Sequence, residues 1–321
     1  MQLPQKLLES LEAVKGFDKK AFEKVHASGE QVTSIRVNPL KWSIVNGQWS
    51  IGNNIHYSSF TIDNKIPWTS YGYYLSQRPS FTFDPFFHAG CYYVQEASSM
   101  FLEQALKQTV DLSTPLKILD LCAAPGGKST HIQSLISKDS LLVSNEVIKS
   151  RANVLKDNII KWGCNNVVVT ANDPKDFAKL ENYFDVIVVD APCSGSGLFR
   201  KEPEAIEEWS LNNVQLCSQR QQRILADVWP SLKKNGILIY STCSYSKEED
   251  EAISDWILNE LPIANCQLQI EKEWGIAETN CGYRFWPDKV KGEGFFIACF
   301  RKKEGADPYF SKIKAKPEQL N

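Results

Sequence analysis

The stretch GILIYSTCSY, residues 236–245, decides the fold, because an apolar run passes here into a polar turn with Cys243 at its edge. A short and continuously apolar run such as residues 237–240 is typical of a strand covered on both faces in a parallel sheet. Ligands of open α/β sheets bind outside the carboxyl ends of the strands. A second apolar run, residues 185–190, passes in the same way into APCSG with Cys193. The sequence therefore predicts that Cys193, Cys243 and Asp190 meet at one edge of a sheet.

Strands and helices alternate on either side of these two runs, as expected of βαβ units with a parallel sheet. We predict strands at residues 116–121, 141–144, 167–170, 185–190 and 237–240, and helices at 130–136, 149–162, 203–233 and 248–258. Two further strands, at 267–270 and 295–300, are expected to form an antiparallel pair that closes the sheet. Ser246 and Glu249 have the spacing of a capping box for the helix that follows Cys243.

The first part of the chain has a different character. Residues 4–28 show apolar residues at helical spacing in two short helices, and residues 34–38 alternate like a strand. Aromatic residues then recur to about residue 93, and we expect most of them to pack in a core while a few could stack on bases: Trp42, Trp49, Tyr57, Phe60, Trp68, Tyr71, Tyr73 and Tyr74. This predicts a small α+β domain over residues 1–110, a second domain over 111–303, and a basic tail or linker start over 304–321.

The composition is that of an ordinary soluble globular protein, since 43% of the residues are apolar and 23% are charged. The sequence lacks an apolar run of about 18 residues and a signal-peptide pattern at its start, so we expect no membrane span and a cytoplasmic location. The nine cysteines form no CxxC pair, which argues against a disulfide framework and a zinc site. The net charge of −2 is uninformative, although residues 284–316 are locally basic, typical of either a solvated tail or a phosphate-binding surface.

A glycine-rich loop, DLCAAPGGKST at residues 120–130, follows the first strand of the second domain and opens a helix. Such a turn lets the backbone approach a ligand and points helix N-terminal amides at it. Its end resembles a phosphate-binding P-loop, but that motif needs a glycine five residues before Gly127, where Cys122 stands. An NTPase is therefore disfavoured.

Three acids follow successive strands. Glu146 lies about 20 residues after the glycines, where an acid often meets ribose hydroxyls, and Asp173 and Asp190 follow the third and fourth strands. Each acid alone is also typical of a surface turn, but their serial placement favours a ligand site.

A free cysteine is usually a small buried hydrophobe. We expect this for Cys91, Cys164, Cys217, Cys266, Cys281 and Cys299. Cys193 and Cys243 differ because each leaves a buried strand into a polar turn, and a nucleophile needs such access together with a nearby cation such as Lys128.

These motifs resemble those of the RNA cytosine-5 methyltransferases of the NOL1/NOP2/Sun family. The resemblance rests on DLCAAPGGKS, VVDAPCSGSGLFRK and YSTCSY, with SIRVNP upstream and VKGEGFF downstream, and covers about residues 4–303. It is closest to the bacterial branch that modifies small-subunit ribosomal RNA, the RsmF type. It implies a Rossmann-like class I methyltransferase core, with a mostly parallel seven-stranded sheet and an antiparallel edge strand, after a small α+β domain similar to an RNA-recognition module.

The resemblance also implies chemistry. The cofactor would be S-adenosylmethionine, and the reaction would be methylation of carbon 5 of a cytidine in RNA, with 16S ribosomal RNA or the small subunit as partner, by a monomer without a metal. A tRNA substrate is the alternative. The cofactor would lie against Cys122, Ala123, Ala124, Pro125, Gly126, Gly127 and Lys128, with Glu146 on the ribose, Asp173 by the adenine, Arg151 reaching toward it, and Asp190 near the methyl donor and the target base. Cys243 would be the nucleophile, and Cys193 would help to release the covalent adduct.

Two other functions are alternatives for this sequence: a DNA cytosine-5 methyltransferase and a non-catalytic RNA-binding assembly factor. DNA cytosine-5 methyltransferases place the nucleophile in a Pro-Cys dipeptide, which would be Cys193, but the Thr242-Cys243-Ser244 turn favours the RNA arrangement. A non-catalytic RNA-binding assembly factor is disfavoured by the presence of Cys243, Cys193, Asp190 and Lys128 together. Longer relatives carry a further C-terminal RNA-binding domain, so residues 312–317 are expected to begin a linker, in a short family member or a shortened chain.

Overall fold

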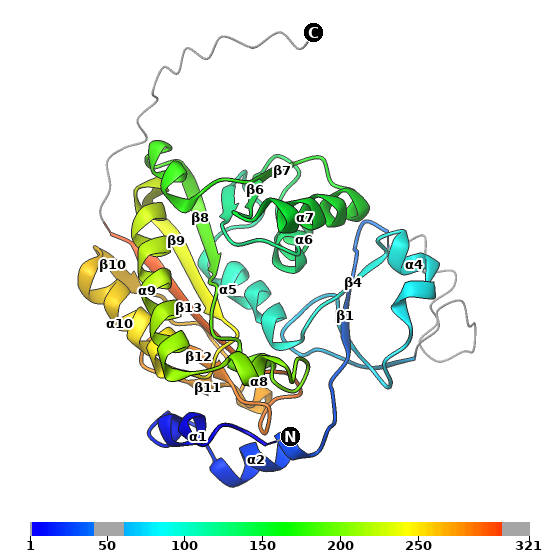
Figure 1. Ribbon diagram of the computed structural model, residues 1–321. Helices are drawn as coiled ribbons and strands as arrows, with labels where there is room; N and C mark the ends of the chain where they lie inside the picture. The colour runs from blue at the N-terminus through cyan, green and yellow to red at the C-terminus, as the bar shows by residue number, and fades with distance from the viewer. Residues whose placement is uncertain (1, 42–60, 304–321) are drawn as a thin grey trace.

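The computed structural model describes residues 2–41 and 61–303. Figure 1 shows a small N-terminal sheet beside a larger α/β core, with the first two helices lying below that core. Four of the aromatic residues singled out above, Trp42, Trp49, Tyr57 and Phe60, and the tail over residues 304–321 lie outside the described residues.

The N-terminal region begins with the two predicted helices, α1 (Gln5–Leu11) and α2 (Lys19–Ala27). A four-stranded antiparallel sheet follows in the described residues, in the order β2-β3-β1-β4. Its elements are β1 (Ser34–Val37), β2 (Ile62–Lys65), β3 (Gly72–Leu75), the short helix α4 (Pro85–His88) and β4 (Tyr92–Val94). Trp68 and Tyr74 are buried, as predicted for most of the aromatic residues, and they join the hydrophobic cluster of the larger core.

The core is a sheet of nine strands among the described residues, in the order β11-β12-β13-β9-β8-β5-β6-β7, with β10 paired to β13. The strands are β5 (Lys117–Asp120), β6 (Leu141–Asn145), β7 (Val167–Thr170), β8 (Phe184–Asp190), β9 (Leu232–Thr242), β10 (Ile263–Asn265), β11 (Ala277–Glu278), β12 (Tyr283–Phe285) and β13 (Phe295–Lys302). The run from β7 to β9 is parallel, and β13 is antiparallel to β9. The predicted α/β class and its five parallel strands are confirmed.

The antiparallel part of the sheet is larger than predicted. Four strands, β10 to β13, follow β9 instead of two, so the expected number of seven strands is wrong. The expected strand at 267–270 is absent, and side chains bond its backbone instead. The Tyr283 hydroxyl bonds Leu268, at 2.5 Å to its N–H and 3.0 Å to its carbonyl oxygen, and the Gln108 amide bonds Gln269, at 2.6 Å to its N–H and 3.0 Å to its carbonyl oxygen. These bonds replace strand pairing there, and the neighbouring β10 pairs with β13 instead.

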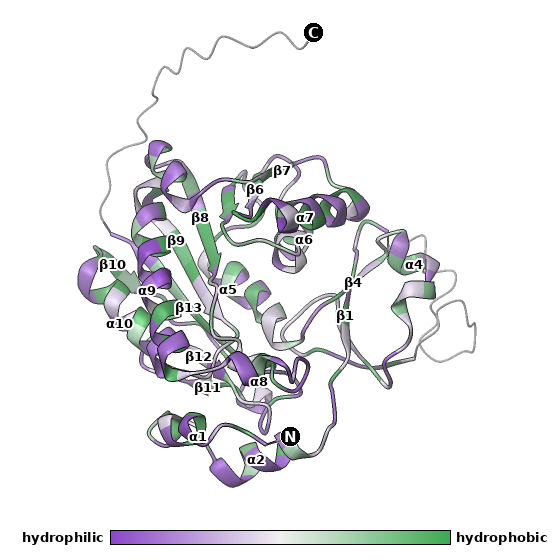
Figure 2. Cartoon of the chain, in the orientation of Figure 1, coloured by the Kyte–Doolittle hydropathy of each residue, from purple (hydrophilic) through white to green (hydrophobic). Residues whose placement is uncertain are grey.

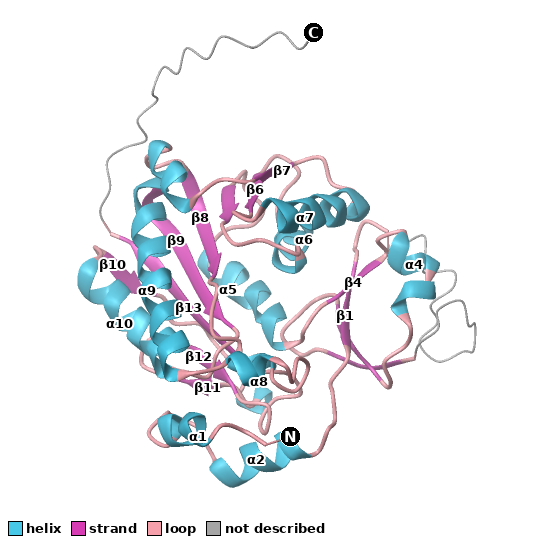
Figure 3. Cartoon of the chain, viewed as in Figure 1, coloured by secondary structure: helices cyan, strands magenta, loops and turns pink. Residues whose placement is uncertain are grey.

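Helices cover both faces of the sheet, and the strands between them are apolar (Figures 2 and 3). The helices are α5 (Leu102–Thr109), α6 (Gly127–Leu135), α7 (Lys149–Trp162), α8 (Ala205–Glu208), α9 (Leu211–Val228) and α10 (Glu251–Glu260). Apolar side chains of α9 and α10 pack on one face and those of α5 and α6 on the other. The single helix predicted over 203–233 is two helices, because Ser210 is extended and caps α9 through its side chain.

The N-terminal helices are tied to the core. Leu7, Leu11 and Phe22 form one buried cluster with Tyr245 and Trp286. The ring of Phe22 meets Tyr245 edge-on at 5.0 Å between centroids. The turn that carries Cys243 therefore rests on residues from the start of the chain.

Candidate active site

The two predicted cysteines come together at the carboxyl ends of β8 and β9. These strands are adjacent and parallel, with Asp190 opposite Ser241. The Sγ atoms of Cys193 and Cys243 lie 3.1 Å apart, and both cysteines are free thiols. The structure thus places both sulfurs at one edge of the sheet.

The surroundings of Cys193 favour its protonated form. Two causes raise the pKa of the Cys193 thiol well above its usual value: the hydrogen bond with Cys243, which is the larger, and burial. Either sulfur can act as the donor in this contact. The structure thus gives Cys193 an environment in which a neutral thiol is favoured.

A buried carboxylate, Glu249, holds the two cysteine turns together. Its oxygens accept hydrogen bonds from the backbone N–H of Ser194 at 2.8 Å, from the Ser194 hydroxyl at 2.5 Å and from the Ser244 hydroxyl at 2.6 Å. Gln221 of α9 adds a fourth at 3.3 Å. The predicted capping box is wrong, because the Ser246 side chain makes no capping bond and Glu249 turns inward to these partners. Sequence spacing alone gave no signal for this role.

Replacing Glu249 with alanine is expected to lower kcat by about 10- to 100-fold, because small misplacements of reacting groups are costly. The free energy of unfolding should fall by about 1–3 kcal/mol, since the Ser194 donors are left buried without partners. Urea unfolding and steady-state kinetics measure both effects. Glu248→Ala is the matched control, because Glu248 is an exposed neighbour. A Glu249→Ala protein with the parental kcat would contradict this role.

An ion pair stands beside the cysteines. The Lys128 ammonium donates to Asp190 Oδ2 at 2.7 Å, and the Ser241 hydroxyl donates to Asp190 Oδ1 at 2.7 Å. Burial opposes the charge on Lys128, but Asp190 outweighs it and raises the pKa of Lys128 above its usual value. A proton donor and an acceptor therefore lie together at the strand ends.

The predicted glycine-rich loop, residues 122–128, joins β5 to α6 tightly. Gly126 has a φ of 111°, a left-handed conformation that favours glycine, and it forms the N-cap of α6. The Ala123 N–H donates to the Asn145 carbonyl at 2.8 Å, which ties the loop to the end of β6. Burial raises the pKa of the Cys122 thiol well above its usual value, so this cysteine does not resemble a nucleophile.

Two side chains from α7 fasten the same loop. Arg151 donates to the Ala124 carbonyl at 3.1 Å and pairs with Glu146 at 3.3 Å. Asn158 donates to the Pro125 carbonyl at 2.8 Å. The structure therefore brings Glu146 and Arg151 to the loop, and their contact with a cofactor stays a prediction.

Asp173 lies at the end of the neighbouring strand β7. Its side chain accepts a hydrogen bond from the Lys175 N–H at 3.2 Å and so begins a short 3-10 helix. This contact is local, and it leaves the prediction that Asp173 meets an adenine as a prediction.

Asp120, at the end of β5, is a candidate that the sequence analysis did not single out. It is fully buried, and Ser129 donates to its Oδ2 at 2.7 Å. Its Oδ1 has no hydrogen-bond partner within the described part of the chain. Burial raises the pKa of Asp120 to about 7. Its position at a strand end, directly before the glycine-rich loop, was the available signal.

Arg36, on β1, is a second residue that sequence reasoning missed. It is fully buried and donates to Gln95, Thr130, Ser134 and the carbonyl of Gly127, with the shortest bond 2.6 Å to the Thr130 hydroxyl. Burial lowers the pKa of Arg36 to about 9. The N-terminal sheet thereby fixes the first turn of α6, where the glycine-rich loop ends.

The remaining cysteines are placed as small hydrophobes. Cys91, Cys217, Cys281 and Cys299 are buried, and Cys164 and Cys266 are partly buried. Residues 2–41 and 61–303 contain no group of three or more His, Cys, Asp or Glu side chains that could hold a metal ion. Within the same ranges, the helices are all too short or too polar to cross a membrane.

Comparisons with known proteins agree on one family. Residues 107–301 match the family of the 16S rRNA methyltransferases RsmB/F, and residues 3–97 match the N-terminal domain of 16S rRNA methyltransferase RsmF. Ribosomal RNA small subunit methyltransferase F of Aeromonas hydrophila is 35% identical over 279 residues, covering 84% of this chain and 57% of the relative. The chain thus spans little more than half the length of this relative.

Solved structures show the same fold. A methyltransferase homologue from Pyrococcus horikoshii superposes with a TM-score of 0.71 at 27% identity, over 94% of this chain and 100% of the other. NSun6 from the same organism, solved with SFG, gives a TM-score of 0.74 at 21% identity, over 94% and 98% of the two chains. At 21% identity, the similarity to NSun6 shows a shared fold and nothing more. Both family matches and the 35% identical relative show that the chain belongs to the RsmB/F family of 16S rRNA methyltransferases.

Proposed function

We propose that this protein uses S-adenosylmethionine to methylate carbon 5 of a cytidine in RNA, with 16S ribosomal RNA or the small ribosomal subunit as its substrate. The observation that carries the proposal is the 3.1 Å contact between Cys193 and Cys243 beside the Asp190–Lys128 ion pair. Two thiols, a carboxylate and an ammonium at one sheet edge suit addition of a nucleophile to an electron-poor ring. Family membership supports the choice of RNA.

The residues present fit S-adenosylmethionine. Its ammonium suits the partnerless Oδ1 of the buried Asp120. Its ribose diol suits Glu146, which is buried at the end of β6 and joined to the loop through Arg151. Residues 122–128 would lie along its methionine and ribose portion, and Asp173 would lie by the adenine. When bound, the cofactor supplies an electrophilic methyl group.

Carbon 5 of cytosine is a poor nucleophile until a thiolate adds to carbon 6. In our proposal Cys243 loses its thiol proton to solvent and its sulfur forms a bond to carbon 6, while the ring electrons shift from the double bond between carbons 5 and 6 toward nitrogen 3. Asp190 faces nitrogen 3 and the exocyclic amine, and Lys128 provides the proton that this ring nitrogen gains. Carbon 5 can then take the methyl group.

Release reverses the first step. A base removes the proton from carbon 5, the double bond to carbon 6 re-forms, the bond between carbon 6 and the Cys243 sulfur breaks, and nitrogen 3 returns its proton to Lys128. The Cys193 thiol, in contact with that sulfur, is placed to assist its departure. The target base must leave any stack to be reached from both faces, so we propose an unpaired or flipped cytidine.

We further propose that the protein acts in the cytoplasm as a monomer. Its domains would be residues 1–110 and 111–303, and residues 304–321 would form a tail.

A transfer assay tests this function. Purified protein, S-adenosylmethionine with a labelled methyl group, and either 16S ribosomal RNA, small subunits or tRNA should yield 5-methylcytidine in the ribosomal substrates. Bisulfite sequencing then locates the cytidine, and RNA from cells lacking the gene should be unmethylated there. Label in tRNA alone would instead show the alternative substrate. Absence of 5-methylcytidine, together with no cofactor binding by calorimetry, would indicate an RNA-binding assembly factor.

A further inference from the structure

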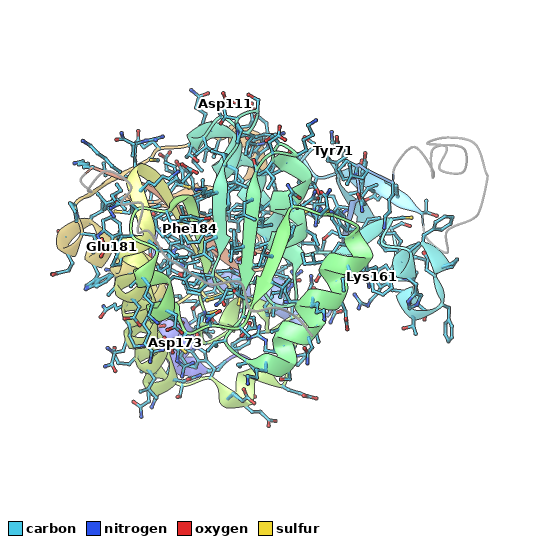
Figure 4. All side chains as sticks on the ribbon, turned by 90° about the horizontal axis from the view of Figure 1, so that it is seen from above. Tyr71, Asp111, Lys161, Asp173, Glu181 and Phe184 are labelled. Atoms are coloured by element: carbon cyan, nitrogen blue, oxygen red, sulfur yellow. The ribbon has the colours of Figure 1, made fainter. Side chains whose placement is uncertain are left out.

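A cavity of about 300 Å³ lies between the N-terminal sheet and helix α7, outside the site described above. Arg78, Phe87 and Tyr93 line it from the N-terminal region, and Lys161 and Trp162 line it from the last turn of α7. Figure 4 shows Lys161 on α7, next to the N-terminal region. The volume is at the lower end of the range of small-molecule sites, so the cavity can take one planar group.

The lining has the composition of a single-stranded nucleic-acid site. The Lys161 ammonium lies 4.2 Å from the centre of the Phe87 ring, so a cation and an aromatic face stand side by side. Neither Lys161 nor Arg78 has a carboxylate within ion-pair distance in residues 2–41 and 61–303, and the described lining includes no acid. The Arg78 guanidinium likewise lies 5.3 Å from the centre of the Phe81 ring. Aromatic side chains stack on bases, and lysine and arginine pair with phosphates.

The cavity is connected to the candidate active site. A Cβ atom added to Gly127 would lie 3.4 Å from the Tyr93 ring, so Tyr93 stands between the cavity and the first residue of α6. Asn158 lines the cavity and also donates to the Pro125 carbonyl of the glycine-rich loop. The cavity is thus in contact, through Tyr93 and Asn158, with the loop and the helix that begin the candidate active site.

We propose that this cavity binds an unpaired nucleotide of the substrate RNA. Its base stacks on the aromatic lining, and its phosphates pair with Lys161 and Arg78. The inference rests on the proposed function in one respect, that RNA is the substrate. It adds a second contact point, which selects RNA that offers an unpaired nucleotide.

The test compares the parent with the double variant Arg78→Ala/Lys161→Ala. The probe is a fluorescein-labelled single-stranded RNA of about 12 nucleotides, read by anisotropy over a range of salt concentrations. We expect Kd to rise about 10-fold and the slope of log K against log salt to fall by about 1.4, since each single-strand phosphate contact contributes about 0.7. The affinity for S-adenosylmethionine should stay within about 2-fold by calorimetry, which also shows that the variant is folded. Lys138→Ala, an exposed lysine on the core, is the matched control.

Cross-linking supplies a second readout. In the parent, RNA with 5-bromouridine at successive positions should attach to Tyr93 or Phe87 from one position only. Unchanged affinity and salt slope in the double variant, or cross-links only elsewhere, would overturn the inference. A parent that binds RNA through this cavity but forms no 5-methylcytidine would overturn the proposed function alone. A parent that does not bind RNA would overturn both.

Discussion

Cys243→Ala is expected to abolish methyl transfer, with kcat lower by about 10⁴-fold or more, because removal of a nucleophile leaves only binding and electrostatic effects. Cys193→Ala should also stop turnover but for a different reason. Its sulfur touches that of Cys243, and it favours the protonated form, so its loss should impair release rather than addition. The alanine variant at Cys193 should therefore accumulate protein that is covalently attached to RNA.

Denaturing gels with labelled RNA measure this difference directly. The Cys193→Ala protein should give a slower band that survives detergent, and the Cys243→Ala protein and the double variant should give none. Cys266→Ala is the matched control, because Cys266 is partly buried away from the site. An active Cys243→Ala protein with an inactive, adduct-free Cys193→Ala protein would reverse the assignment and match the Pro-Cys arrangement of the DNA enzymes.

Asp190→Asn is expected to lower kcat by about 10²- to 10⁴-fold, the usual contribution of a positioned acid–base group. Asparagine keeps the size of the side chain and an acceptor for Ser241, but it removes the anion that pairs with Lys128. The raised pKa of Lys128 depends on that anion, while burial works against the charge. Without Asp190 the pKa of Lys128 should fall, and the alkaline limb of the rate profile should move to lower pH.

The pH profile of kcat, measured with saturating RNA and cofactor, distinguishes this role from a structural one. Asp139→Asn, at an exposed position, should retain the parental profile. If Asp190→Asn lowers kcat equally at every pH and leaves the alkaline limb in place, the coupling between Asp190 and Lys128 plays no part in the rate.

The core of the fold could be predicted from the sequence because its signals are local. Apolar runs such as those of β8 and β9 mark buried parallel strands, and the residues at their ends follow from the topology. The meeting of Cys193, Cys243 and Asp190 at one edge therefore needed only the assumption that β8 and β9 are neighbours. Their roles in catalysis, like the division of the chain into domains, stay predictions.

The missed features depend on partners that are distant in the sequence. Glu249 looked like a helix-capping residue because Ser246 lies three residues before it, but its partner Ser194, 55 residues away, approaches only after two strands have paired. Arg36 meets α6 about 94 residues away. The strand expected at 267–270 failed because side chains bond its backbone, the Tyr283 hydroxyl at Leu268 and the Gln108 amide at Gln269.

Mapping a trapped adduct tests the central claim most directly. The parent protein is incubated with S-adenosylmethionine and substrate RNA containing 5-fluorocytidine, whose carbon 5 carries no proton that a base can remove. The complex is then digested and the modified peptide is sequenced by mass spectrometry. Our account predicts one methylated nucleotide attached to the sulfur of Cys243. Attachment to Cys193 or to another side chain, or methylation of ordinary RNA without any trapped complex, would contradict it.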